Sequence, residues 1–250
     1  MLLGAGGTLL SSMALVLIAQ GLSASYAGLA RAEVDDLIER DLDHISTGVY
    51  NLVAAESGAF AGELDTSMRV AQAFLKRSGG ASPLPKVERW EAVNQHDGSA
   101  ATVDLPRLAV GGAWQGRSAT FDSSSPFVDD LSGLLNVTVT LFQRMNERGD
   151  MLRVATTVPA GNGERAVGTY LPAFLADGSP NEVLAAILRG EGYRGRSVVM
   201  NDWYLTAYEP LYSVSSPGEL IGMLYVGKRQ ADIEARIRSA IVQTRIGATG

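Results

Sequence analysis

The sequence contains no cysteine and only two histidines, His44 and His96. The absence of cysteine excludes disulfides and thiolate metal sites. The two histidines are far apart in unrelated patterns, which makes a zinc site or a nucleophile–histidine pair a poor prediction. The chain also lacks the G-x-S-x-G, H-E-x-x-H and phosphate-loop motifs of common enzymes. We therefore predict no enzymatic activity, no cofactor and no metal.

Charged residues are few, at 19% of the chain, and the formal net charge is −6. An acidic balance argues against nucleic acid as a partner, which requires a basic surface. The acidic pairs Asp35-Asp36 and Asp129-Asp130 lack a catalytic spacing and are typical of solvated helix faces or caps. A chain of 250 residues can form one large or two small domains with a substantial core.

No charged side chain precedes Arg31. Residues 1–24 include a stretch of roughly 20 largely apolar residues, which is enough to cross a bilayer, and we predict a transmembrane helix there. A cleaved signal peptide is the alternative, although it usually has a basic start and a shorter apolar core. At the other end, residues 230–250 are predicted to form a helix that leads toward a second membrane span, truncated within these residues.

Residues 25–80 have a helical pattern and are predicted to form a stalk. Apolar residues from Val34 to Val53 recur mostly at steps of three and four, with charges on the other faces. Such a stripe packs against its own domain or pairs with the same helix of a second copy. The glycines at 58 and 62 predict a break between Ser57 and Asp65, before a second helix over Thr66–Arg77.

Residues 136–226 predict one antiparallel sheet broken by a single helix. Two strand-like runs flank the polar loop NERGD, and Asn162-Gly163 is a strong hairpin signal. Ser179 and Glu182 form a potential capping box for a helix that ends at Gly190. A last hairpin follows around SVSSPG. The order strand, strand, strand, helix, strand, strand predicts an α+β, PAS-like sensor with a pocket and no built-in chemistry.

The proline- and glycine-rich region from Ser82 to Asp130 predicts short strands and loops. We expect it to belong to the same unit as the sheet. Residues 81–229 are accordingly predicted to form one ligand-binding domain.

Alternate side chains of a strand share a face. In WYLTAYEP, Tyr204, Thr206 and Tyr208 therefore point one way, while Trp203 points the other way with an apolar set. Three hydroxyls on a rigid strand are good donors for a small polar ligand. A solvent-facing strand rich in tyrosine and threonine is an equally good interpretation of this pattern.

Several motifs, in order, resemble the Cache 3/Cache 2 fusion domain of bacterial chemoreceptors: WEAVNQHDG, VTLFQRMNERGDMLRVATTV, LRGEGYRGR, WYLTAYEPLY and ELIGMLYVG. The resemblance covers about residues 33–228. It implies a Cache sensor fold with a long membrane-proximal helix, a small-molecule ligand and a homodimer. It also implies a place in the bacterial inner membrane, with the sensor domain in the periplasm or outside the cell.

The resemblance also implies binding residues. In related sensors of citrate and C4-dicarboxylates, a basic strand residue and polar residues of the penultimate strand hold the ligand carboxylates. Arg153 and Thr156 match the first group, and Thr206 and Tyr208 match the second. This chain has Thr206 and Tyr208 where those sensors have basic residues, and Thr156 where they have histidine. A small monocarboxylate or an uncharged ligand is therefore expected. Tyr204 shares the strand face, and Tyr170 and Trp203 are secondary candidates.

The functional expectation is the periplasmic sensor domain of a methyl-accepting chemotaxis protein. The same input domain also occurs in sensor histidine kinases and diguanylate cyclases. A membrane-anchored periplasmic enzyme would need a catalytic constellation that the sequence does not show. A structural dimerisation module would have the Tyr204 face packed, with no cavity.

Overall fold

A computed structural model describes residues 58–247 of the chain, with side chains described as far as Ser239. The transmembrane helix predicted for residues 1–24 and the first part of the predicted stalk lie outside these residues. Within residues 58–247, no helix is both long enough and apolar enough to span a membrane.

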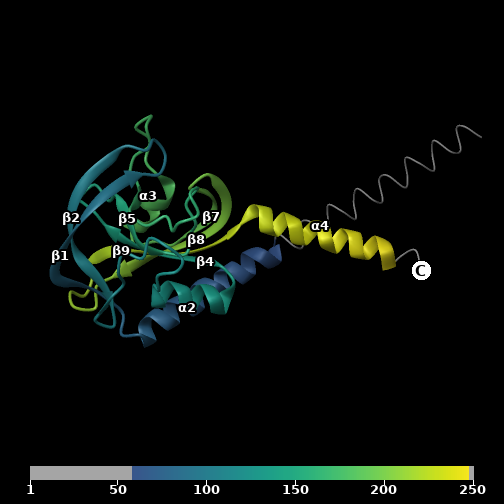
Figure 1. The fold of residues 1–250 in the computed structure, drawn as a ribbon, viewed down its shortest axis with the longest axis horizontal. Coiled ribbons are helices and arrows are strands. Elements are labelled where there is room, and N and C mark those ends of the chain that lie inside the picture. Colours follow the sequence, from purple (N-terminus) through teal and green to yellow (C-terminus); the bar gives the residue numbers. More distant parts are fainter. Residues whose placement is uncertain (1–57, 248–250) are drawn as a thin grey trace, which may run out of the picture. The chain divides into compact units, whose positions relative to one another are not determined.

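Nine strands form one sheet in the order β3-β2-β1-β6-β5-β4-β9-β8-β7 (Figure 1). Neighbouring strands are antiparallel except β1 and β6, which pair in parallel at Val93 and Asn94. The predicted α+β fold with a largely antiparallel sheet is confirmed. The strands are β1 (Ala81–Asn94), β2 (Ala100–Val110), β3 (Ala113–Trp114), β4 (Thr138–Arg144), β5 (Met151–Thr156), β6 (Thr169–Leu171), β7 (Tyr193–Val199), β8 (Asp202–Tyr212) and β9 (Leu220–Arg229).

The described helices are residues 58–77, α2 (Pro126–Leu135), α3 (Glu182–Leu188) and α4 (Gln230–Gly247). The helix break predicted between Ser57 and Asp65 is wrong for residues 58–65, which are helical. Phe60 and Leu64 are buried there, and their packing outweighs the low helix propensity of Gly58 and Gly62. At the other end of the domain, β9 passes into α4 without an intervening residue.

The helix α3 begins later than the capping box predicts. Asn181 is its N-cap, and its Oδ1 accepts hydrogen bonds from the backbone N–H of Val183 (3.1 Å) and Leu184 (3.4 Å). Ser179 instead donates its hydroxyl to Asp177 Oδ1 at 2.6 Å, in the turn before the helix. The serine is therefore occupied by the turn, and the next residue able to cap takes its place.

Strands β1 and β2 are longer than the prolines suggest. The register between them shifts from Leu84 to Val87, so Pro85 lies in a bulge. Pro106 lies on a length of β2 whose other edge has no strand partner, since β3 pairs only with Ala109 and Val110. Bulges and free edges are the places where a sheet tolerates a residue without an N–H.

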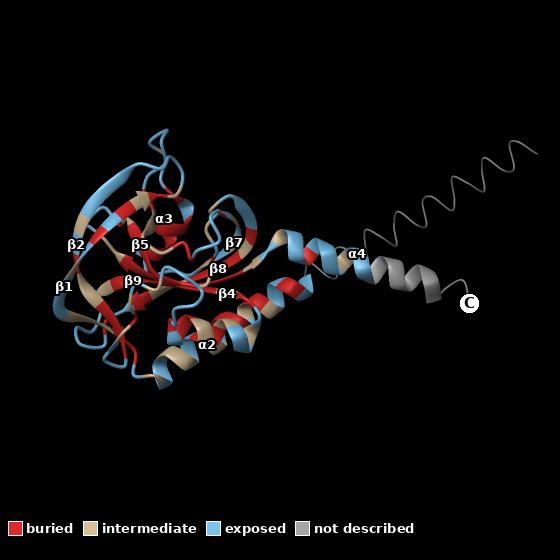
Figure 2. Cartoon of the chain, in the orientation of Figure 1, coloured by how far each residue is buried: buried red, intermediate tan, exposed pale blue. Residues whose placement is uncertain are grey.

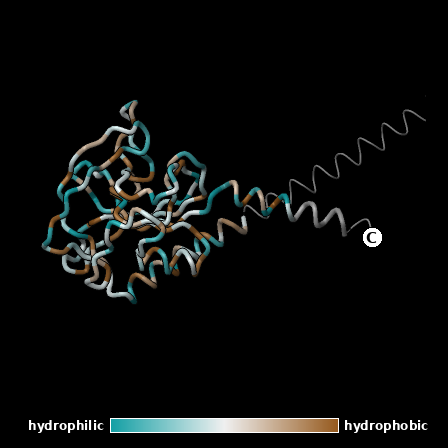
Figure 3. Tube along the Cα trace, in the orientation of Figure 1, coloured by the Kyte–Doolittle hydropathy of each residue, from teal (hydrophilic) through white to brown (hydrophobic). Residues whose placement is uncertain are grey.

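The two faces of the sheet bury two separate clusters of side chains. On the α2 face, α2 and helix 58–77 pack together, with the Phe74 and Phe127 rings 5.7 Å apart, over the buried residues Val139, Leu141, Leu152, Leu224 and Val226. On the α3 face, α3 covers Phe142, Met151, Tyr208, Met223 and Tyr225. Buried positions therefore concentrate on the central strands (Figure 2), where hydrophobic residues are interleaved with hydrophilic ones (Figure 3).

Candidate ligand-binding site

A bulge in β5 brings Arg153 and Thr156 to one side of the sheet. Phe142 pairs with Arg153 and Thr140 pairs with Thr156, while Leu141 pairs with Ala155. Val154 is thus an extra residue in β5. Phe142 and Thr140 are two residues apart on β4 and share a face, so their partners share it too. In a regular strand, a spacing of three would place Arg153 and Thr156 on opposite faces.

Arg153 is the central feature of the α3 face, because it is 1% exposed and its donors are only partly used. Its Nη1 donates to Thr169 Oγ1 and lies 3.7 Å from the sulfur of Met200. Its Nη2 donates to Gln95 Oε1 at 2.9 Å. Its Nε is buried and has no partner among the described residues.

No carboxylate of the described residues forms an ion pair with Arg153; the ionisable neighbours that act on it are Tyr208, Tyr225 and Tyr204. Burial lowers the pKa of Arg153 below its ordinary value. Since the ordinary pKa of arginine lies far above neutral pH, Arg153 keeps its charge. It is therefore a buried cation with no counter-charge among residues 58–239, which is costly unless something neutralises it.

The aromatic residues around Arg153 form a second layer. The Phe142 ring lies 5.0 Å from the guanidinium carbon. The Tyr208 ring packs at a tilt against Tyr225 and edge-on against Tyr193, with ring centroids 5.0 and 6.1 Å away. Burial raises the pKa of Tyr208 to about 12, and burial also raises the pKa of Tyr225 well above its ordinary value. Both phenols are therefore neutral hydrogen-bonding groups and cannot balance the arginine.

The two threonines already have internal partners. The Thr156 hydroxyl lies 2.5 Å from that of Thr140 and accepts from the N–H of Val158 at 3.0 Å. Thr206 Oγ1 donates to the Gly195 carbonyl at 2.9 Å and lies 3.1 Å from Ser197 Oγ. Both share the face of Arg153, Thr156 because of the bulge at Val154, but their hydroxyls are engaged in holding neighbouring strands.

A pocket of about 550 Å³ opens beside this site. Tyr208 and Gln95 line it, and Gln95 connects it to Arg153 through their hydrogen bond. Trp203 is 47% exposed at its rim, with the Arg196 guanidinium 4.0 Å from its ring. The remaining lining residues are mostly apolar or neutral: His96, Leu171, Leu175, Ser179, Pro180, Asn181, Glu182, Val183, Tyr193, Ser197 and Val198.

Of the seven predicted residues, only Tyr208 and Trp203 line this pocket. Arg153 lies behind its lining and contacts the lining residue Gln95, and the two threonines also lie outside the lining. Tyr204 is buried on the α3 face and lines another pocket, of about 420 Å³, with Lys228, Arg229 and Arg236. Tyr170 packs against the α2-face cluster, and its neighbour Thr169 makes the contact with Arg153.

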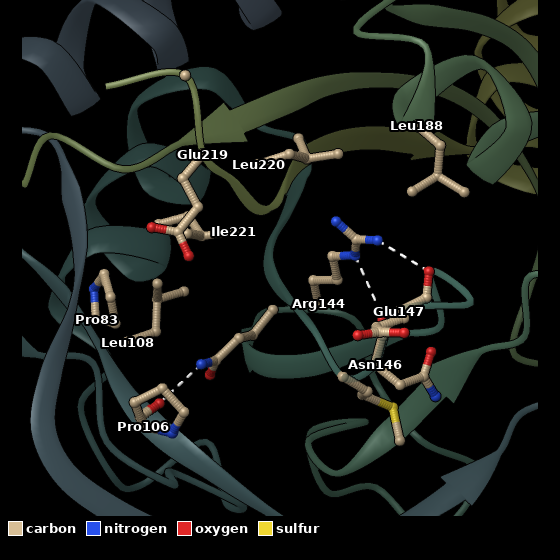
Figure 4. Close-up of a pocket in the computed structure, with 13 residues that line it drawn as sticks. Pro83, Pro106, Leu108, Arg144, Asn146, Glu147, Leu188, Glu219, Leu220 and Ile221 are labelled. Carbon is tan, nitrogen blue, oxygen red and sulfur yellow. Dashed lines mark hydrogen bonds between the residues drawn. The ribbon is translucent and has the colours of Figure 1, made fainter. Parts of the chain in front are cut away.

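A larger pocket, of about 840 Å³, lies between β1, β2 and the start of β9 and does not include Arg153 (Figure 4). Its cation, Arg144, already donates to the carbonyls of Asn146 (3.0 Å) and Glu147 (2.9 Å). Glu147 and Glu219 also line it. An unmet charge is stronger evidence for a ligand than volume is, so we assign the candidate site to the pocket beside Arg153.

Sequence reasoning missed Gln95, Thr169 and Met200, which surround the guanidinium. Gln95 is 58 residues from Arg153 in the chain, and no local pattern marks such a contact. Within residues 58–247 there is no cluster of three or more histidine, aspartate or glutamate side chains suited to a metal ion. The contacts of the Arg153 guanidinium are neutral, and the adjacent pocket is lined by apolar and neutral side chains together with Arg196, Glu182 and His96.

One sequence profile, described as the Cache 3/Cache 2 fusion domain, matches residues 29–250, most of the chain. No curated protein and no solved structure matches the chain.

Proposed function

The chain belongs to the Cache 3/Cache 2 fusion family, and from this premise we propose that it is the sensor domain of a transmembrane chemoreceptor for a small monocarboxylate. Cache domains are extracytoplasmic sensors of small molecules and not catalytic modules. The chemoreceptor, the inner membrane and the homodimer are parts of the proposal, which the resemblance of the motifs supports. A histidine kinase or a diguanylate cyclase can carry the same input domain.

The observation that carries the ligand class is the unneutralised charge of Arg153. A carboxylate carries the opposite charge and accepts two parallel hydrogen bonds from a guanidinium. Such charge-assisted bonds are about twice as strong as neutral ones. The ligand would place its carboxylate at Arg153 and a hydroxyl or carbonyl near Tyr208.

The surroundings of Arg153 favour one carboxylate rather than two or three. Arg196 and His96 line the pocket, but Arg196 lies over the Trp203 ring, and Glu182 adds a negative charge to the lining. Leu171, Leu175, Val183 and Val198 offer apolar surface to the rest of the ligand. A second buried carboxylate would meet no buried cation and would carry a desolvation cost.

The test is a thermal-shift screen of the 250-residue chain against monocarboxylates of two to six carbons, with dicarboxylates and the corresponding amides alongside. A ligand at about 100 times its Kd adds roughly 2.7 kcal/mol of stability. Arg153→Met should abolish the shift. Arg189→Met, at an exposed arginine paired with Glu191, is the matched control and should keep it.

A shift by monocarboxylates that survives Arg153→Met would move the site elsewhere. Shifts by amides as large as those by acids would show that charge is not what the pocket recognises. The absence of any shift would favour a structural module over a sensor of this class.

A further inference from the structure

Gln95 holds the position next to Arg153 that a ligand carboxylate needs. We propose that its side-chain amide is a built-in stand-in for the ligand, which the ligand must displace from Arg153. The inference rests on the proposed function, because it assumes that the ligand binds Arg153 through a carboxylate. It makes Gln95 a determinant of affinity and of ligand class.

The use of the guanidinium donors supports this role. Nε and Nη2 lie on one edge of the group and together form a fork for the two oxygens of a carboxylate. In the structure, Gln95 Oε1 accepts from Nη2 at 2.9 Å, whereas Nε is buried without a partner. The single amide oxygen is placed to accept from Nη2 alone, whereas a carboxylate offers one oxygen to each donor. The fork is therefore half-filled by a neutral group.

The other side-chain contacts of Gln95 are weak. Its Nε2 lies 3.5 Å from the Val198 carbonyl and 3.4 Å from the ring nitrogen of His96, both at the long end for hydrogen bonds. Its backbone N–H is held well, by the Tyr170 carbonyl at 3.1 Å. The side chain can therefore swing away while the backbone stays in place.

Gln95 is also placed where a ligand would reach it. It is half-buried in the turn after β1 and lines the 550 Å³ pocket beside Tyr208 and Val198. A carboxylate entering from this pocket would meet the amide before it meets the guanidinium. Its departure would break the side-chain link from the turn after β1 to Arg153 on β5 and to Val198 on β7.

Three variants test the stand-in in the full chain. Gln95→Glu provides a tethered carboxylate with both oxygens. It should raise Tm by about 3 °C, the shift expected for roughly 1 kcal/mol in a domain of this size. That gain should vanish in the double variant Gln95→Glu/Arg153→Met. Gln115→Glu is the control, since Gln115 is a buried glutamine whose amide donates to the Ala113 carbonyl and forms no hydrogen bond to an arginine of the described residues, and it should lower Tm.

The pH dependence of the gain gives a second readout. A carboxylate paired with Arg153 has a folded-state pKa below the ordinary glutamate value of about 4.3. Its stabilisation is present above that value and is lost as the pH falls through the folded-state pKa. If Gln95→Glu lowers Tm by the same amount with and without Arg153, the two groups do not pair and the inference is wrong.

Acetate and propionate are the probes for displacement. Gln95→Ala removes the competitor and should lower the half-saturating concentration by about tenfold, which is 1.4 kcal/mol, while Gln95→Glu should abolish the response. Weaker binding by Gln95→Ala would make Gln95 a ligand contact and overturn the stand-in. A probe response that survives Arg153→Met would instead overturn the proposed function. Loss of the response in Arg153→Met with no change in Gln95→Ala would overturn the stand-in alone.

Discussion

Among residues 58–239 two arginines are buried, Arg153 within β5 and Arg165 against the end of β5, and their surroundings are opposite. Arg165 is 5% exposed and uses all its donors. Its Nη1 and Nη2 donate to the two oxygens of Asp129 at 2.6 and 3.1 Å. The carbonyls of Thr120 (3.0 Å), Thr156 (2.9 Å) and Ser123 (3.4 Å) accept the rest. The partners of Arg153 are one amide oxygen, one hydroxyl and one sulfur, and its Nε has no hydrogen-bond partner among the described residues.

We call Arg165 the architectural cation, because its partners belong to the fold, and Arg153 the receptive cation, because some of its donors are unused. Arg165 ties α2, through Asp129, to the end of β5 and the loop at residues 120–123, and its charge is neutralised within the fold. Asp129 is not a solvated helix-face residue, because its side chain is 30% exposed and paired with Arg165. Its Oδ2 also accepts from the backbone N–H of the N-cap residue Ser125 at 2.7 Å, in agreement with the alternative prediction of a cap. Arg153 is buried to a similar degree and has no acidic partner among residues 58–239, which supports the proposed anion site.

The largest effect should come from removing the architectural cation. Arg165→Met leaves the Asp129 carboxylate and the three carbonyls without this donor, and we expect a loss of about 3 kcal/mol in the free energy of unfolding. Urea unfolding measures it, and Arg189→Met on the surface should change stability by less than about 0.5 kcal/mol. A loss below about 1 kcal/mol would mean that the Arg165 network is not structural.

The next largest effect is a loss of stability at high pH caused by Tyr208, which lies near Arg153. The pKa of Tyr208 is raised by burial to about 12, against about 10 in the unfolded chain. The unfolded chain releases this proton first, so its contribution to stability is complete below pH 10 and is lost as the pH rises toward 12. That loss is about 2–3 kcal/mol. Tyr208→Phe should flatten the fall in stability measured between pH 10 and 12, and identical curves for the two proteins would contradict the burial of the phenol.

A smaller loss of stability is expected when only Asp129, the acidic partner of Arg165, is made neutral. Asp129→Asn keeps the shape of the side chain, but it removes the charge and replaces one acceptor by a donor. We expect a loss of about 1–2 kcal/mol, since the three carbonyls still accept from Arg165. Urea unfolding of this variant beside Arg165→Met measures the difference. An equal loss in both variants would assign the whole effect to the ion pair.

The smallest effect should come from removing the receptive cation in the absence of ligand. Arg153→Met replaces a buried, unneutralised charge by an apolar chain of similar length. We expect a stability within about 1 kcal/mol of the parent, or above it. This variant tests the difference between Arg165 and Arg153 most directly. Their similar burial alone would predict the same loss of stability on substitution by methionine. A loss as large as that of Arg165→Met would make both arginines architectural.

The sequence predicted the features that depend on neighbouring residues. The β4–β5 hairpin at NERGD, the turn at Asn162-Gly163 and the alternation of Tyr204, Thr206 and Tyr208 are local patterns, and the structure confirms each. The position of Arg153 on the face of Tyr208 also agrees with the resemblance to Cache domains, although its role as a ligand contact stays a prediction.

The features that the sequence did not predict depend on distant residues or on competition between local ones. The bulge at Val154 and the contact from Arg153 to Gln95 are set by tertiary pairing across many residues. Asn181 replaced Ser179 as the cap because Asp177 competes for the serine. The glycines at 58 and 62 suggested a break that the buried Phe60 and Leu64 prevent.

The direct passage from β9 into α4 has a mechanical consequence. A flexible loop would absorb small movements of the sheet, but here Arg229 ends the strand and Gln230 begins the helix, with Arg229 also bonded to Asp232 at 2.8 Å. The 18 residues of α4 extend about 27 Å at 1.5 Å per residue. If strand and helix move as one rigid unit, a tilt of about 5° at Arg229 displaces the C-terminal end of α4 by about 2 Å.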